Sequence, residues 1–234
     1  MKKKIINLWN QFKDLLFPRS CFCCNSRIEN GIICNLCESN LVRIQNICPK
    51  CGADNQEYDC RFCKKNDFTF DKARSVFHFG KNLQILIHNL KYDEMKKVAK
   101  FLGKYASDYL QNHKPFSKID IIAPVPLHKV RKRERGFNQA ELLTREISER
   151  MDWEHIPKLI LRNRFTQTQT KLGRKDRHSN VSGAFTLNSK YDVKNKNILI
   201  VDDVFTTGAT VNSISKTLKD NEARNVFVLT IARA

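Results

Sequence analysis

The pattern of hydrophobic and polar positions changes near residue 70. Between residues 18 and 70 polar residues predominate and large apolar residues are few. Beyond that point apolar residues recur with the 3.6-residue period of helices or in the short alternating or continuous runs of strands. The pattern predicts strands over 74–80, 119–127, 158–162, 183–187, 197–203 and 225–233, and helices over 82–92, 95–110, 138–150 and 210–219.

Strands that alternate with helices favour a mainly parallel sheet covered by helices. We therefore expect one α/β domain over residues 71–234, with its ligand in the crevice at the carboxyl ends of the strands. The run 197–203 is the most apolar of the predicted strands. The residues that follow it should lie at this crevice.

A separate helix is predicted at the amino terminus, over residues 1–17. Ile5, Trp9, Phe12 and Leu16 fall near one helical face there. Packing on its own protein is the simpler interpretation of this helix, and a membrane-surface or partner helix is the alternative. Polar residues interrupt the apolar stretch, so we predict no signal peptide. No window approaches the ~20 apolar residues that cross a bilayer, which predicts a cytoplasmic protein.

The charge of the chain favours an anionic partner. Lys and Arg number 42 against 24 Asp and Glu, which gives a formal net charge of +18. A polyanion or a phosphorylated ligand fits this balance. Charge alone does not choose between nucleic acid, a nucleotide and a membrane surface.

The cysteines predict two zinc ribbons over residues 18–70. All nine cysteines lie between residues 21 and 63, and eight form four C-x-x-C pairs. Where thiols stay reduced, repeated pairs of this kind are typical of zinc sites, because two such turns supply four tetrahedral thiolates. The expected ligands of two structural zinc ions are Cys21, Cys24, Cys34, Cys37, Cys48, Cys51, Cys60 and Cys63.

The pairing of these knuckles is open from spacing alone. Sequential pairing is the simplest arrangement, with the first two knuckles on one ion and the last two on the other, although a crossed arrangement also fits. Cys23 is left over as a bystander beside Cys24, or as a substitute for Cys21. A redox role for a single C-x-x-C is the weaker interpretation, since four copies cluster.

The stretch ILIVDDVFTTGAT (198–210) carries the candidate chemistry of the larger domain. An apolar strand that ends in two acids is used in nucleotide hydrolysis, in phosphate acceptance by aspartate, and in binding of phosphoribosyl diphosphate. The first use needs a G-x-x-x-x-G-K-[ST] loop, which this chain lacks. The second needs the acid pair early in the chain, whereas this pair lies near its end.

Binding of a ribose phosphate accounts for every residue type in the stretch. Adjacent carboxylates of Asp202 and Asp203 can accept hydrogen bonds from the 2- and 3-hydroxyls of a ribose. The turn that follows can offer amide N–H groups and threonine hydroxyls to a 5-phosphate at a helix amino terminus. The predicted binding residues of this stretch are Val201, Asp202, Asp203, Thr206, Thr207, Gly208, Ala209 and Thr210.

This stretch resembles the phosphoribosyl-diphosphate signature of type I phosphoribosyltransferases. Together with PVPLHKVRKRERGFNQAELL (124–143) and RNRFTQTQTKLGRKDRHSNVSGAF (162–185) behind a double zinc ribbon, the chain is similar to the ComF family. The resemblance implies a type I phosphoribosyltransferase-like fold, and for some members a role in handling DNA taken up in natural transformation.

The resemblance also implies roles for particular residues. Asp202 and Asp203 become the expected catalytic pair that contacts the ribose hydroxyls, and Thr206 to Thr210 the phosphate cradle. Arg135 in the RGFNQ pattern and Arg177 in the next block are the expected cations for phosphoribosyl diphosphate, with Mg²⁺ as its companion ion.

Two functions remain from the sequence. The first is a competence protein that binds phosphoribosyl diphosphate and handles single-stranded DNA with a partner helicase or translocase. Basic runs over 129–135 and 158–177 fit a nucleic-acid path. The second is an active phosphoribosyltransferase, a pentosyl-transferring enzyme of nucleotide or base salvage, whose acceptor the sequence does not specify.

Overall fold

The computed structural model describes residues 19–45, 47–54, 60–90, 95–128, 130, 133–134, 136–163 and 183–234. The helix predicted over residues 1–17 lies outside these ranges.

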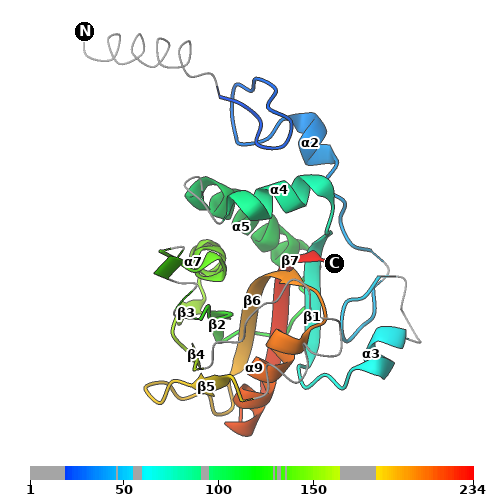
Figure 1. The fold of residues 1–234 in the computed structure, drawn as a ribbon. Helices are drawn as coiled ribbons and strands as arrows, with labels where there is room; N and C mark the ends of the chain where they lie inside the picture. The colour runs from blue at the N-terminus through cyan, green and yellow to red at the C-terminus, as the bar shows by residue number, and fades with distance from the viewer. Residues whose placement is uncertain are drawn as a thin grey trace.

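A five-stranded parallel sheet forms the centre of the larger domain (Figure 1). Its strand order is β1-β7-β6-β2-β3, and every neighbouring pair is parallel. The predicted α/β class with a mainly parallel sheet is therefore confirmed. The strands are β1 (Lys72–His78), β2 (Ile121–Pro124), β3 (Glu154–His155), β6 (Asn197–Phe205) and β7 (Asn225–Arg233).

Side chains of the central strand β6 alternate between two apolar cores, because successive strand residues face opposite sides of a sheet. Leu199 and Val201 belong to one core, and Ile198 and Ile200 to the other. Three helices supply residues to the first core: α4 (Lys81–Asn89), α5 (Met95–His113) and α7 (Gln139–Met151). Helix α9 (Ala209–Asp220) supplies residues to the second core.

Two of the predicted strands lie outside the main sheet. β4 (Ile160–Arg162) and β5 (Phe185–Leu187) pair with each other as an antiparallel hairpin. Helix α9 contacts β5, and Thr217 of α9 donates a hydrogen bond to the Phe185 carbonyl at 3.3 Å. The hairpin therefore lies beside the face that carries α9.

The two zinc ribbons contact different parts of the domain. In the first ribbon, helix α2 (Asn35–Ser39) meets α5 through a hydrogen bond from Tyr105 to Glu38. Asn82 of α4 also donates to the Cys37 carbonyl at 3.0 Å. The second ribbon, with helix α3 (Arg61–Lys65), lies against β1 and β7, where Gly52 packs on the Ala73 carbonyl.

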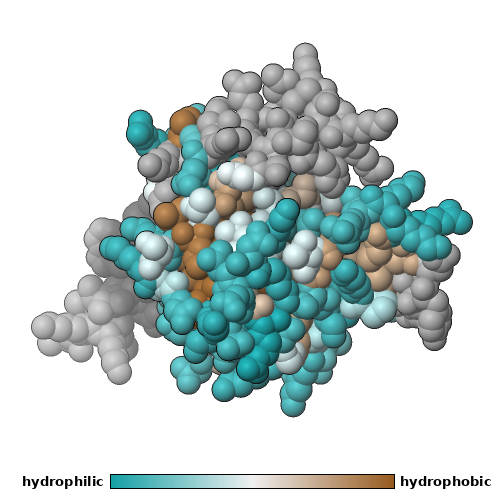
Figure 2. All heavy atoms as spheres, turned by 90° about the horizontal axis from the view of Figure 1, so that it is seen from below, coloured by the Kyte–Doolittle hydropathy of each residue, from teal (hydrophilic) through white to brown (hydrophobic). Residues whose placement is uncertain are grey.

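No helix within the described ranges is both long and apolar enough to span a membrane. The face drawn in Figure 2 is mostly hydrophilic, and its hydrophobic residues gather in limited patches.

Candidate functional site

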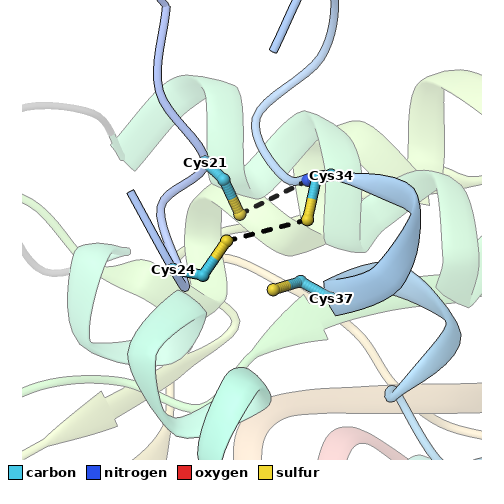
Figure 3. Close-up of side chains that lie close together, drawn as sticks. All are labelled: Cys21, Cys24, Cys34 and Cys37. Carbon is cyan, nitrogen blue, oxygen red and sulfur yellow. Dashed lines mark hydrogen bonds between the residues drawn. The ribbon is translucent and has the colours of Figure 1, made fainter. Parts of the chain in front are cut away.

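The eight knuckle cysteines form two clusters with the simplest predicted pairing. Cys21, Cys24, Cys34 and Cys37 make the first cluster, and their side chains point toward a common centre (Figure 3). Within each cluster the sulfurs all lie within 4.8 Å of one another. Sequential pairing is thus confirmed, and the second cluster consists of Cys48, Cys51, Cys60 and Cys63.

The sulfur spacings fit tetrahedral zinc. A Zn–S bond of about 2.3 Å places tetrahedral thiolates about 3.8 Å apart. Cys24 and Cys34 sulfurs lie 3.7 Å apart, and Cys48 and Cys63 sulfurs 3.8 Å apart. Both clusters therefore have the donor set and the dimensions of structural zinc sites, where four thiolates leave no open position for catalysis.

Cys23 lies outside the first cluster. Its Sγ donates to the Asn82 carbonyl of α4 at 3.6 Å. Burial, together with the neighbouring Cys21 and Cys24, raises the pKa of this thiol to about 11. Cys23 therefore has the predicted bystander position, and Cys21 belongs to the cluster.

The two acids lie close together near the carboxyl end of β6. Both are half-buried, and the Asp203 N–H donates to Asp202 Oδ1 at 2.9 Å. Burial, the Asp203 charge and a hydrogen bond between the two carboxyl groups raise the pKa of Asp202 well above its ordinary value of 3.8. Ionising both acids in this position therefore costs folding free energy.

The turn after the acids forms a small pocket at the amino terminus of α9. The pocket holds about 40 Å³, more than the roughly 10–15 Å³ that one water molecule needs. A helix amino terminus there favours an anion. The residues that line the pocket are Asp202, Val204, Phe205, Thr206, Thr207, Gly208, Ala209, Thr210 and Val211.

Gly208 is required by the shape of this turn. Its φ of +77° is left-handed, and a Cβ placed there would come within 2.7 Å of Phe205 Cζ and 2.9 Å of Phe68 Cε1. Only glycine adopts this conformation without strain and leaves room for the two rings. Thr207 Oγ1 accepts from the Ala209 N–H at 3.4 Å, which continues the turn into α9.

Replacing Gly208 with alanine is expected to lower the free energy of unfolding by about 1–3 kcal/mol, because the new methyl group is strained and displaces an aromatic ring. Denaturant titration of both proteins measures this difference. Gly136 has a φ of +76° with nothing near its Cβ position, so Gly136→Ala controls for conformational strain alone. Equal losses in both variants would contradict the packing role of Gly208.

The loop of Pro124 to Pro126 lies next to β6. The Val125 N–H donates to the Val201 carbonyl at 2.9 Å, and Asn138 Nδ2 donates to the Val125 carbonyl at 3.0 Å. Asn138 also caps α7 by accepting from the Ala140 N–H. Val201 itself is fully buried, so its backbone supports the site and its side chain belongs to the core.

A cation that sequence reasoning did not single out lies near the acids. The positive charge of Arg162, at the end of β4, acts to lower the pKa of Asp202. Its guanidinium lies over the Phe185 ring, 5.5 Å from the centroid. Spacing along the chain gave no signal for this electrostatic interaction, because Arg162 and Asp202 are far apart in the sequence. The predicted cations Arg135 and Arg177 lie outside the described residues.

Curated relatives match almost the whole chain. Competence protein F of Haemophilus influenzae is 32% identical over 217 residues, which are 90% of this chain and 94% of that protein. The DNA utilization protein YhgH of Escherichia coli K12 is 30% identical over 226 residues, which are 94% of this chain and 99% of the relative.

The other comparisons describe parts of the chain. The family model of the double zinc ribbon domain matches residues 12–66, in agreement with the two cysteine clusters. An adenine phosphoribosyltransferase structure matches 63% of this chain and 75% of its own, with 17% identity and a TM-score of 0.38. A likeness of this size says nothing about activity. Competence protein F is more than 30% identical to this chain over nine-tenths of the chain's length. The chain therefore belongs to the ComF family.

Proposed function

We propose that the protein binds phosphoribosyl diphosphate, with Mg²⁺, at the β6–α9 turn and handles single-stranded DNA during natural transformation. The main support for this ligand is the position of Asp202 and Asp203, directly before a pocket at a helix amino terminus. A scaffold alone gains nothing from adjacent half-buried acids, since their repulsion destabilises the fold. A ribose with two free hydroxyls offers those acids hydrogen-bond donors.

Titration calorimetry tests the ligand. Phosphoribosyl diphosphate with Mg²⁺ should bind the wild-type protein at one site, and ribose 5-phosphate should bind more weakly because it lacks the diphosphate. An absence of binding by phosphoribosyl diphosphate at millimolar concentration would refute this part of the proposal.

The DNA part of the proposal is supported by a row of exposed lysines on α5. Lys96, Lys100 and Lys104 recur every fourth residue, so they follow one side of the helix. Asp108 is the sole acid in α5. Such a row can track successive phosphates of a nucleic-acid strand. The names of the two relatives, a competence protein and a DNA utilization protein, agree with this role.

Reversing the three charges (Lys96→Glu, Lys100→Glu, Lys104→Glu) is expected to weaken binding of a single-stranded oligonucleotide at least tenfold at low salt. If each lysine neutralises one phosphate, the negative slope of log affinity against log salt should become less steep by about 2. Fluorescence anisotropy over a range of salt concentrations measures both quantities.

Three exposed lysines elsewhere supply a control with the same change in charge: Lys190, Lys196 and Lys216. Reversing them should leave the salt slope unchanged. Equal losses in both triple variants would show that net charge, and not α5, governs binding.

An active phosphoribosyltransferase is the second candidate, favoured by Arg162. A cation near the acids could stabilise a departing diphosphate. Release of diphosphate from phosphoribosyl diphosphate across a panel of bases and amines tests this candidate, and no release with any acceptor would count against it. In either case we propose that the protein acts in the cytoplasm, where thiols stay reduced and hold zinc. We also propose that it acts with a helicase or translocase as its partner.

A further inference from the structure

The second cysteine cluster is built into the edge of the central sheet by two arginines. Arg74 of β1 donates from Nη2 to the Pro49 carbonyl at 2.9 Å, and Arg233 of β7 donates from Nη1 to the Cys51 carbonyl at 2.8 Å. Burial lowers the pKa of both guanidinium groups, and the cluster cysteines oppose that shift. Four thiolates around a divalent ion carry two net negative charges, which these two arginines balance.

Arg233 also connects this cluster to the strand that carries the acids. Its guanidinium lies 4.5 Å from the centroid of the Phe205 ring and 5.0 Å from that of Phe62. Phe205 is the last residue of β6. Phe62 lies in α3, between the cluster cysteines Cys60 and Cys63. One side chain thus contacts both a zinc knuckle and the residue at the start of the pocket turn.

Four phenylalanines continue this connection to the pocket turn. Phe62 stacks on Phe68 with centroids 5.5 Å apart, and Phe68 stacks on Phe70 at 4.7 Å. All three rings also lie 6.2–6.3 Å from the Phe205 ring. Gly208 rests directly on Phe205 and Phe68. The floor of the pocket turn is therefore made in part by residues of the second ribbon and the segment that follows it.

Asn212 provides a second and independent connection. From the first turns of α9, its Nδ2 donates to the Asp67 carbonyl at 3.0 Å. Its Oδ1 accepts from the Thr69 N–H at 2.6 Å. Both bonds join the helix start to the segment directly after the second ribbon. By contrast, Asn82 joins the first ribbon to α4.

We infer that the second zinc ribbon is a structural part of the sugar-phosphate site. Arg233, Asn212 and the three rings of Phe62, Phe68 and Phe70 are positioning residues: they hold the turn 205–210 in its binding shape without touching the ligand. Loss of the second zinc should therefore loosen this turn and weaken binding, whereas loss of the first should not. The effect on affinity rests on the proposed function, while the effect on the turn does not.

Hydrogen exchange of the full-length, zinc-loaded protein tests the inference. Asn212→Ala keeps all zinc ligands and is expected to speed amide exchange in residues 203–212 about tenfold, because two hydrogen bonds are lost. Calorimetry should show a loss of affinity for phosphoribosyl diphosphate of about tenfold. The matched control is Asn82→Ala, which breaks the corresponding bond of the first ribbon and should leave exchange in this peptide unchanged.

Two serine variants test the zinc link itself. Cys60→Ser in the second cluster should speed amide exchange in residues 203–212, whereas Cys24→Ser in the first cluster should not. Metal analysis should find one zinc ion remaining in each variant. Unchanged exchange in Asn212→Ala, or equal changes on loss of either zinc, would overturn the inference. If the wild-type protein binds no phosphoribosyl diphosphate, the proposed function fails, and the exchange comparison still decides the role of the ribbon.

Discussion

Replacing Asp202 and Asp203 together with asparagine is expected to weaken binding of phosphoribosyl diphosphate about a hundredfold or more. Hydrogen bonds to charged groups contribute about 1.5–3 kcal/mol each. Two such bonds from the ribose hydroxyls amount to about 3–6 kcal/mol, and each 1.4 kcal/mol is a factor of about ten in affinity. Asparagine keeps the shape of each side chain, so the loss reports the carboxylates themselves.

The same variant is expected to be more stable than the wild-type protein at neutral pH. Because the pKa of Asp202 is raised in the folded protein, the folded state holds a proton that the unfolded chain releases. Wild-type stability therefore falls as pH rises from about the ordinary pKa of 3.8 through the raised value. Asparagine has no proton to release, so the variant should lack this part of the pH dependence.

Calorimetry and thermal unfolding between pH 3 and pH 8 measure the two effects. Asp220→Asn, at the far end of α9, is the matched control and should change neither. If the double variant binds as tightly as the wild-type protein, the two acids do not contact the ligand. A variant that loses binding because it unfolds would show a structural role for the acids.

Removing both zinc ions is expected to unfold the ribbons and to lower the thermal midpoint of the whole chain by at least about 10 °C. Structural zinc contributes on the order of 10 kcal/mol per site, comparable with the stability of an entire domain. Residues of both ribbons are buried in cores that also hold β6 residues, so the loss of either ribbon also removes packing from the sheet. For a chain of this size, 1 kcal/mol shifts the midpoint by about 2–4 °C.

Scanning calorimetry with and without a strong chelator, with metal content measured in parallel, tests this expectation. Added zinc should restore the midpoint. Cys23→Ser should retain two zinc ions and the wild-type midpoint, since its sulfur lies outside the cluster. A zinc-free protein with an unchanged midpoint would contradict a structural role for the metal.

The features that sequence predicted correctly depend on local patterns. The C-x-x-C spacing is a property of one turn, so the cysteines could be assigned to two zinc clusters before the fold was known. The strand over 225–233 is mostly apolar because it is buried on both faces, and its predicted bounds match β7. The acid pair was likewise predicted at the end of a buried strand over 197–203, and β6 extends beyond it to Phe205.

The features that sequence missed depend on contacts between distant residues. β3 has two residues, too few to show a period. Arg233 is an ordinary residue at the end of a strand until folding brings it over Phe205 and beside Cys51. The sequence of the second ribbon looked mainly polar, and the packing of its phenylalanines against sheet residues appears only in the folded protein.

A crystal structure of the protein with phosphoribosyl diphosphate and Mg²⁺ tests the central claim most directly. We expect ribose hydroxyls within hydrogen-bonding distance of Asp202 and Asp203, with the 5-phosphate against the turn of residues 206–210. Ligand bound elsewhere, with this pocket vacant, would contradict it.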